Sequence, residues 1–547
     1  MTAARFDGWC SLALLISIAW MSILALNSDS IGVPRDESFY LAASDFAANW
    51  YVDLFTDDVE AFSASQINRR DRFGWNWEHP VLMKSAFGLS KRIFHDELGW
   101  IRTPLLAYRL PTMFLAALGM FLVFALARTV GGLGAGFLAQ ALYAFLPRMF
   151  FHSHLACFDM PVTVAWLGVV FCFIKARGDA RWIVPAGIAL GLGFATKLNI
   201  FFLPFALLAF ALVECAILWR TGDSNLKCVI KRYALIGGAF IFVGGLVFWI
   251  HWPLLYHDPV MQIRRYISFH AKHVHYPVDY FGVLQYRPPF SVLFPFVMTA
   301  VSVPLVTLAL AGYGGYVAGA TWWKNRRERW SEEVIVYGQL LLSAIVPIVI
   351  IALPNTPIFG GTKHWMPAMP FFAILGGIGG ARLLAQLPRP MNGALMRFVC
   401  GAILVSAPLW ATVEYGSQGP AYYNGVVGGP PGAAKLGLSR NFWGHSTVGV
   451  LELINTEPPP NALVFWHKAT HRSIQAYQRS GLLRKDVKYT GDWTAPYSDW
   501  AVYHTQQEKL PEEVDIWRAY KTRWPIGGLY VDGLELMSVY RRPEPRR

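Results

Sequence analysis

The sequence predicts a mainly α-helical, polytopic membrane protein with about eleven spans and a small C-terminal α/β domain. Three observations predict this class. The chain has 547 residues, of which 54% are hydrophobic and only 15% charged, whereas a soluble domain carries about 25% charged residues. Apolar runs near the ~20 residues of one membrane span recur as far as residue 413. The segment 414–547 lacks such runs and gains polar residues, so the composition argues against both a disordered protein and a soluble enzyme.

The apolar runs set the order of the predicted spans. The first, 9–26, could pass for a signal peptide, but Ser28-Asp29-Ser30 is a poor cleavage site, so we expect a retained helix. The others lie at 107–127, 131–146, 159–174, 182–196, 198–219, 234–252, 290–320, 334–353, 365–384 and 395–413.

The basic residues of the short loops predict the orientation, because Lys and Arg accumulate on the cytoplasmic side. With a cytoplasmic N-terminus, alternate loops are basic. Their Lys and Arg are Arg128; Lys175, Arg177 and Arg181; Arg220, Lys227, Lys231 and Arg232; Lys324, Arg326, Arg327 and Arg329; and Arg382, Arg389 and Arg397. The net charge of +13 therefore indicates topology rather than nucleic acid as a partner. An odd number of spans places the tail outside, in contact with water.

The outer tail is expected to form an α/β domain. Residues 462–466 and 500–503 predict strands, 512–521 a helix, and 526–540 contains turn signals between apolar stretches. A Gly/Pro-rich stretch, 425–432, marks the boundary region. The predicted division is a membrane domain, 1–413, with the outer loop 27–106, and a soluble extracytoplasmic domain, 414–547.

Acidic residues at span ends are the first candidates for chemistry, because charges within a membrane are expensive and often functional. Asp36 and Glu37 follow the first span, and such a pair could deprotonate a hydroxyl or hold a cation. Asp36 could instead cap the helix that follows it. Asp159 stands at the outer mouth of another span, where a carboxylate at a helix start would also be structurally ordinary.

Further candidates lie in the same outer loops. Glu78 and His79 precede Pro80, an arrangement that also suits a simple helix start. Lys197 lies between two apolar runs at the outer face, where it could bind an anion. Lys363 and His364 follow two glycines, whose exposed N–H groups and neighbouring charge suit a phosphate oxygen.

The loop 253–289 is rich in histidine. His270, His273 and His275 stand close together with His257 nearby. Their spacing fits no standard zinc framework, so we predict a polar aromatic surface there and no metal site. The sequence also contains no Walker-type loop, G-x-S-x-G or H-E-x-x-H, which removes support for nucleotide hydrolysis and the common hydrolases.

Several short motifs, in this order and at these topological positions, resemble the GT-C superfamily of lipid-phosphate-sugar-dependent glycosyltransferases. The closest resemblance is to glycosyltransferase family 39, which includes the protein O-mannosyltransferases and the lipid A aminoarabinose transferase. The motifs are Asp36-Glu37, Glu78-His79-Pro80, Arg109-Leu110-Pro111, Asp159, Gly191 with Thr196-Lys197, the segment 354–370, Tyr422-Tyr423-Asn424-Gly425, Val427-Gly428-Gly429 and Phe442-Trp443-Gly444. Two positions depart from the family pattern: His79-Pro80 continues with Val81 rather than a second proline, and Lys363 replaces the usual arginine.

The resemblance implies a mechanism. The donor would be a polyprenyl-phosphate-linked sugar, and Asp36 would be the general base that activates an acceptor hydroxyl, with inversion at the sugar. Lys197, Lys363 and Arg287 would stabilise the departing phosphate. Glu37, Glu78 and Asp159 would orient the acceptor, the base or a possible divalent cation.

Two function classes stay open at this point. The first is a transferase of mannose or another hexose or pentose, in the bilayer of a bacterial inner membrane, with the N-terminus cytoplasmic and the tail periplasmic. Its acceptor could be a protein, a lipid or a glycan. The alternative is a transporter or flippase of lipid-linked sugars. A third class, a non-catalytic assembly factor that binds through its outer tail, is disfavoured by the intact Asp36-Glu37 pair. The absence of a sequence repeat and the position of the acidic groups in outer loops favour the transferase.

Overall fold

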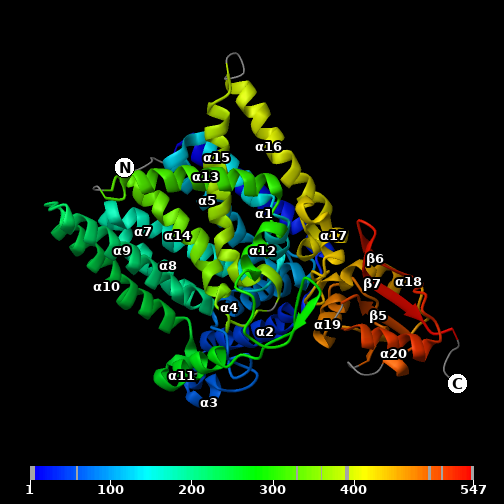
Figure 1. The fold of residues 1–547 in the computed structure, drawn as a ribbon. Coiled ribbons are helices and arrows are strands. Elements are labelled where there is room, and N and C mark those ends of the chain that lie inside the picture. The colour runs from blue at the N-terminus through cyan, green and yellow to red at the C-terminus, as the bar shows by residue number, and fades with distance from the viewer. Residues whose placement is uncertain are drawn as a thin grey trace.

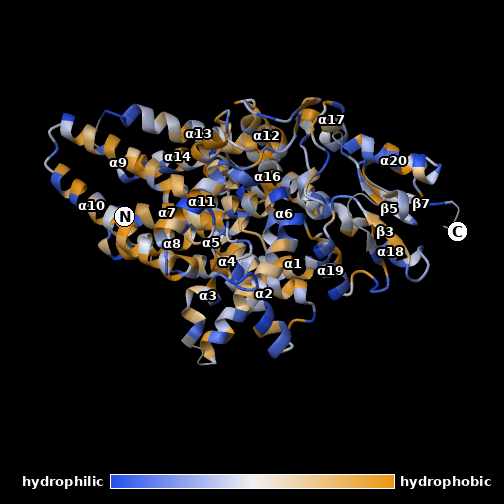
Figure 2. Ribbon diagram, turned by 90° about the horizontal axis from the view of Figure 1, so that it is seen from below, coloured by the Kyte–Doolittle hydropathy of each residue, from blue (hydrophilic) through white to orange (hydrophobic). Residues whose placement is uncertain are grey.

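The computed structural model describes residues 7–56, 59–327, 330–358, 360–388, 393–490, 495–506 and 509–543. Long helices form most of it, and a lobe with a β-sheet lies at the C-terminal end (Figure 1). The long helices α9 and α10 are largely hydrophobic in Figure 2, whereas α20 in the lobe is largely hydrophilic. The predicted class, a membrane helix bundle with a small α/β part, is confirmed.

Within the described ranges, eight helices are long and apolar enough to cross a membrane, or nine if a bent pair forms one span. The bent pair is α12 (Phe294–Ser302) and α13 (Leu305–Asn325), which meet at 118°. The other helices that carry the candidate spans are α1 (Gly8–Leu26), α5 (Pro104–Ala144), α7 (Asp159–Gly178), α9 (Leu203–Arg220), α10 (Leu226–Ile250), α14 (Glu332–Ala352), α15 (Met369–Ala385) and α16 (Ala394–Tyr415).

Helix α5 and the short helix α8 explain why the sequence predicts more spans than this count. Helix α5 has 41 residues, which at ~1.5 Å per residue would far exceed the ~30 Å of a bilayer core. It breaks at Gly132, whose φ is 76°, and the rings of Phe124 and Phe137 on either side lie 4.8 Å apart. Helix α5 is therefore a hairpin that contains two of the predicted runs. Helix α8 (Ile183–Phe194) has only 12 residues, but it accounts for another.

Glycine allows the spans to approach closely. A Cβ atom on Gly314 of α13 would lie 1.9 Å from the carbonyl oxygen of Leu375 in α15. Between α8 and α10, a Cβ on Gly191 would lie 2.5 Å from the carbonyl oxygen of Gly244. Small residues at helix contacts are typical of membrane bundles, where van der Waals packing rather than water exclusion drives association.

Shorter elements connect the spans and carry most of the candidate site. Helix α2 (Arg35–Phe55) starts after Pro34, with Asp36 and Glu37 in its first turn, where acidic groups complement the helix dipole. The remaining short elements of this part are η1 (Ser28–Ser30), η2 (Val59–Phe62), α3 (Ala64–Ile67), α4 (Leu82–Lys91), the π-helical turn η3 (Arg92–Glu97), α6 (Pro147–His154), η4 (Ala180–Trp182), η5 (Leu198–Phe202), η6 (Pro253–Leu255), α11 (Pro259–Ala271), β1 (Val278–Tyr280), β2 (Val283–Gln285) and η7 (Gly361–Ala368).

The C-terminal lobe contains a five-stranded sheet of order β4-β3-β5-β7-β6. Strand β3 pairs in parallel with β4 and β5, whereas β7 pairs antiparallel with β5 and β6. The elements here are η8 (Gly416–Ala421), η9 (Gly425–Val427), α17 (Gly429–Lys435), η10 (His445–Val450), α18 (Leu451–Thr456), β3 (Leu463–Trp466), α19 (His471–Arg479), β4 (Lys488–Thr490), η11 (Ala495–Tyr497), β5 (Trp500–His504), α20 (Leu510–Tyr520), β6 (Gly527–Val531) and β7 (Leu534–Arg541). The strands and the helix predicted from the sequence are confirmed, while the domain division at 413 stays a prediction.

The lobe packs directly on the segment that leads into α2. The backbone N–H of Val33 donates to the hydroxyl of Tyr477 at 2.7 Å, and that of Arg35 donates to the carbonyl of Trp443 at 2.9 Å. A Cβ on Gly32 would lie 1.7 Å from the carbonyl oxygen of His445, so only glycine fits there. These contacts place the lobe on the same side of the bundle as Asp36.

Candidate active site

Asp36 forms an ion pair with a lysine far away in the sequence. Nζ of Lys363 donates to Oδ2 of Asp36 at 3.0 Å, across 327 residues. The lysine side chain is only 3% exposed, whereas that of Asp36 is 29% exposed. Lys363 belongs to η7, which follows Gly360 in the left-handed region with φ 65°. A Cβ on Gly360 would lie 2.4 Å from Cε of Lys363, so glycine makes room for the lysine stem.

Asp159 holds a second lysine in the same way. It is the first residue of α7, and its Oδ1 accepts from Nζ of Lys197 at 2.5 Å, with side chains 4% and 12% exposed. Lys363 also interacts electrostatically with Asp159, so the two pairs form one cluster. Two carboxylates and two lysines sum to zero charge, which limits the cost of burying them.

Glu37 is anchored away from this cluster. Its side chain is fully buried, and its two oxygens accept from Nε and Nη2 of Arg109 at 2.8 and 2.7 Å and from the backbone N–H of Ala156 at 2.8 Å. The rest of the guanidinium donates to the carbonyls of Ser28, Ile31 and Gly32. The pair therefore fixes the start of α2 against α5 and against the segment that follows α6.

Tyr40 and His79 line the region beside the two lysine pairs. The ring of Tyr40 lies 4.1 Å from that of Phe158, and its hydroxyl is 3.3 Å from Nε2 of His79. Burial lowers the pKa of His79 well below 6.5, so the imidazole is neutral and can both donate and accept a hydrogen bond. Burial and the nearby carboxylates of Asp36 and Asp159 raise the pKa of Tyr40, so its hydroxyl keeps its proton.

Glu78 and the loop around it are held by a buried lysine. Oε1 of Glu78 accepts from Nδ2 of Asn76 at 2.8 Å. Nζ of Lys84 donates to the carbonyls of Asn76 and His79 at 2.6 and 2.9 Å. Burial lowers the pKa of Lys84 to about 7. These bonds fix the backbone of the loop that carries Glu78 and His79.

The other predicted residues differ in how closely the structure links them to the cluster. The carbonyl of His364 accepts from Nδ2 of Asn199 at 2.9 Å, which ties η7 to η5. Arg287 lies exposed in the loop after β2. Among the described residues, no hydrogen bond or ion pair connects Arg287 to Asp36 or Asp159.

The donor set does not suit a metal ion. No three His, Cys, Asp or Glu side chains in the described part of the chain lie where they could hold one. In the loop 253–289, Nε2 of His270 contacts the carbonyl of Glu78 and Nε2 of His257 contacts that of Phe62. Asp36 and Asp159 each pair with a lysine.

Sequence reasoning missed three neighbours of the cluster as site residues. Tyr40 follows Asp36 by four residues, a spacing that places both on one face of a helix and could have indicated it. Trp443, whose ring centroid is 4.2 Å from Nζ of Lys363, stands in a motif that the sequence singled out without a role. His152, whose ring lies 5.7 Å from that of Trp443, has a pKa lowered to about 3 by burial. No local signal marked it.

Residues 79–246 match the protein family described as dolichyl-phosphate-mannose-protein mannosyltransferase. The matched part includes His79, Arg109, Asp159 and Lys197, while Asp36 and Lys363 lie outside it. A comparison with curated protein sequences finds no match.

Several solved structures are similar over most of this chain. ArnT from Cupriavidus metallidurans bound to undecaprenyl phosphate is 14% identical, with a TM-score of 0.46 and 98% of each chain covered. The oligosaccharyltransferase of Archaeoglobus fulgidus in its apo form is 13% identical, with a TM-score of 0.49 and coverage of 92% of this chain and 70% of its own. The same archaeal enzyme, AglB, in complex with an inhibitory peptide and a dolichol-phosphate is 12% identical, with a TM-score of 0.46 and coverage of 92% and 72%. The match over residues 79–246 agrees with the resemblance predicted from the sequence, so the chain is similar to membrane glycosyltransferases of the GT-C type.

Proposed function

We propose that this protein moves a sugar from a polyprenyl-phosphate carrier to an acceptor hydroxyl on the outer face of the membrane, with Asp36 as the general base. One observation carries the proposal: a partly exposed carboxylate, Asp36, is held by the buried Lys363 beside a second pair, Asp159–Lys197. A reactive carboxylate and two cations at one place are what an attacking hydroxyl and a departing phosphate require.

The two lysines support a phosphate leaving group. When the bond between the anomeric carbon and the phosphate oxygen breaks, negative charge grows on the phosphate. Lys363 and Lys197 are held in place by Asp36 and Asp159, so they need little reorganisation to stabilise that charge. The description of the matched family names dolichyl-phosphate-mannose, which supports a lipid-phosphate sugar as the donor class. The sugar would be mannose or another hexose or pentose, on an undecaprenyl carrier.

Asp36 would take the proton of the acceptor hydroxyl through Oδ1. Its other oxygen, Oδ2, accepts from Lys363. In the described part of the chain, no group donates a hydrogen bond to Oδ1. The acceptor oxygen attacks the anomeric carbon as its proton passes to Asp36, and the carrier leaves as its phosphate. A single displacement inverts the sugar configuration.

The remaining residues would orient these groups. Glu37 would set the direction of Asp36 through Arg109, because its buried oxygens are already occupied. Tyr40 and the neutral His79 would bind sugar or acceptor hydroxyls, with Glu78 and His364 in supporting positions.

The site and the lobe lie on one side, which fits the predicted topology. Hydrogen bonds from Val33 to Tyr477 and from Arg35 to Trp443 bring the lobe to the start of α2. We propose that both the reaction and residues 414–547 lie on the periplasmic side of a bacterial inner membrane. The acceptor would approach from this side.

Reconstituted protein would test the proposal. Proteoliposomes receive labelled polyprenyl-phosphate sugar, and release of the carrier phosphate and transfer to protein, lipid and glycan acceptors are measured. We expect Asp36→Asn to abolish transfer and Asp29→Asn, an exposed carboxylate of the same loop, to retain it. Equal transfer by the wild type and Asp36→Asn would refute the mechanism. Movement of the donor across the bilayer without carrier release would instead establish the transporter.

A further inference from the structure

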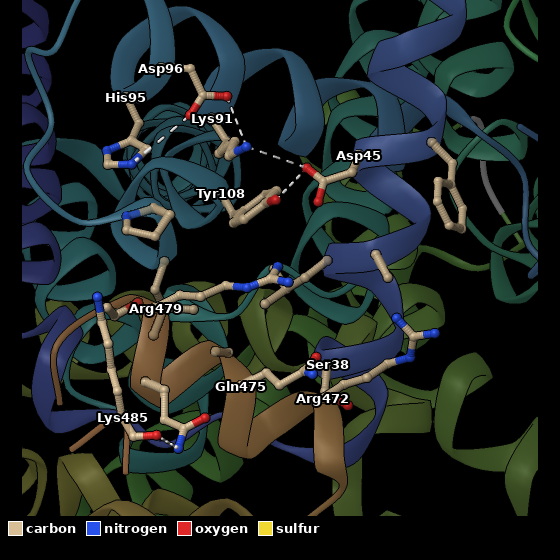
Figure 3. Close-up of a pocket in the computed structure, with 18 residues that line it drawn as sticks. Ser38, Asp45, Lys91, His95, Asp96, Tyr108, Arg472, Gln475, Arg479 and Lys485 are labelled. Carbon is tan, nitrogen blue, oxygen red and sulfur yellow. Dashed lines mark hydrogen bonds and ion pairs between the residues drawn. The ribbon is translucent and has the colours of Figure 1, made fainter. Parts of the chain in front are cut away.

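A cavity of about 870 Å³ lies beside α2, between α4 and η3, the start of α5 and helix α19 of the lobe (Figure 3). The function proposed above does not use it. Ser38, Leu41 and Asp45 line it from α2, Pro104 and Tyr108 from α5. The lobe contributes its other wall.

This cavity is separate from the reaction centre. A helix turns about 100° per residue, so Ser38, Leu41 and Asp45 lie within about 40° of the direction opposite to Asp36. Tyr40, which does lie near the direction of Asp36, does not line the cavity. Helix α2 therefore stands between the two sites.

One wall of the cavity is a closed polar network. Nζ of Lys91 lies 2.8 Å from Asp96 and 3.8 Å from Asp45, and the hydroxyl of Tyr108 donates to Asp45. His95 lies 4.0 Å from Asp96. Figure 3 shows these groups facing one another on one side. The two carboxylates of the cavity are thus already paired.

The opposite wall carries cations without such partners. Arg472 and Arg479 lie seven positions apart on α19, with Gln475 between them on the same face, and Lys485 follows the helix. In Figure 3, Arg479 extends across the space below Tyr108, whereas Arg472 lies on the side of Ser38 and Lys485 on the opposite side. Among the described residues, none of the three cations has a carboxylate within ion-pair distance. The cavity therefore has an excess of positive charge.

The position of the cavity relative to the membrane indicates the source of an anion. Pro104, Leu105 and Tyr108 belong to the first turns of α5, a candidate span. Trp100, just before that span, is 72% exposed, and exposed tryptophans at span ends are typical of the bilayer interface. Lipid phosphates lie at this depth, where clustered Lys and Arg attract them.

We propose that this cavity binds the phosphate-bearing headgroup of an anionic lipid, separately from the sugar-transfer site. Arg479 binds the phosphate, Arg472 and Lys485 add positive charge on either side of it, and Gln475 and Ser38 offer hydrogen bonds to the rest of the headgroup. The first turns of α5 keep the acyl chains on the membrane side. The proposal does not depend on Asp36 or on any transferase activity.

The test compares two charge-matched variants of the full-length protein. The cavity variant is Arg472→Gln/Arg479→Gln/Lys485→Gln. The control variant is Lys488→Gln/Arg518→Gln/Arg523→Gln, which removes three cations of the lobe that do not line the cavity. Native mass spectrometry in detergent measures phosphatidylglycerol and phosphatidylcholine bound at equal concentrations. A separate arm adds inorganic phosphate alone as a competitor.

We expect the wild type and the control variant to bind phosphatidylglycerol in preference to phosphatidylcholine. The cavity variant should bind it more weakly on the order of 100-fold, since each cation near an anionic headgroup contributes about fivefold. Equal binding by the cavity variant, or equal loss in the control variant, would overturn the proposal. Displacement of the lipid by inorganic phosphate at the same concentration would show that the site binds the free anion, and would overturn the assignment to a lipid.

Discussion

Replacing Glu37 with glutamine should destabilise the protein, whereas the same change at the adjacent Asp36 should mainly abolish catalysis. Glu37 is fully buried and accepts three hydrogen bonds, two of them from Arg109. Glutamine has one oxygen that accepts, and its NH₂ group would face a guanidinium N–H. The charge of Arg109 would also stay buried without a counter-ion. Breaking such a pair costs about 3–5 kcal/mol.

The change at Asp36 has a smaller effect on stability for a structural reason. Its side chain is 29% exposed, so water can replace part of the lost interaction. The amide oxygen of an introduced asparagine can still accept from Lys363. Lys363 also keeps Asp159 nearby as a counter-charge, so we expect a loss of about 2 kcal/mol, within the range for a hydrogen bond to a charged group.

Two measurements on the same preparations separate these effects. Denaturant unfolding in detergent, followed by tryptophan fluorescence, gives the midpoint for the wild type, Glu37→Gln, Asp36→Asn and the control Asp29→Asn. Transfer assays at a temperature where all variants are folded give the activity. The anchoring role would be refuted if Glu37→Gln unfolds at the wild-type midpoint but loses transfer activity as completely as Asp36→Asn. That result would mean that Glu37 contacts the reactants.

Three further predictions concern the charges and rings around the cluster. Lys363→Met and Lys197→Met should each lower kcat on the order of 100- to 1,000-fold in steady-state assays, with a smaller change in the donor KM, if the lysines stabilise the departing phosphate; an effect on KM alone would contradict this. Burial lowers the pKa of His152 to about 3 and that of His445 to about 4, so these histidines take up protons at a higher pH in the unfolded state than in the folded state. The unfolding midpoint should therefore fall as the pH drops from about 6.5 towards 4. The fall should be smaller in His152→Asn. Trp443→Ala removes the ring beside Lys363 and should lower activity by about two- to fivefold, as expected for about 0.5–1 kcal/mol of cation–π attraction, with Trp524→Ala on the exposed tail surface as the control.

Local patterns predicted the architecture well because membrane spans are long and uniformly apolar. The hairpin in α5 shows the limit of this reasoning. Two apolar runs predicted two spans. Hydropathy does not show whether a polar loop or a tight turn joins them, and in the structure the turn is at Gly132, whose φ is 76°. Only the contact between Phe124 and Phe137 shows how tightly the chain reverses.

The candidate site was harder to predict because its pairs join distant segments. Asp36 and Glu37 look alike in the sequence, and the resemblance gave both a role near the reaction. The structure separates them by what each carboxylate meets: Lys363 in η7 for one, and Arg109 in α5 for the other. Adjacent residues on a helix point about 100° apart, so such a difference is expected, but the partner cannot be inferred without the fold.

Helix α2 is the element that connects these observations. Its first turn is fixed by Glu37 to Arg109, one face carries Asp36 and Tyr40, and the other face lines the basic cavity. The lobe contacts both sites. Its Trp443 lies beside Lys363 at the candidate active site, and its helix α19 forms one wall of the basic cavity. A headgroup bound between α19 and α2 would hold the two helices together. If the lobe moved away from α2, Trp443 would also move away from Lys363. We therefore expect lipid binding in the cavity to affect the lysine pair through the position of the lobe, even though α2 keeps the two sites apart; transfer activity that is the same with and without phosphatidylglycerol would contradict this.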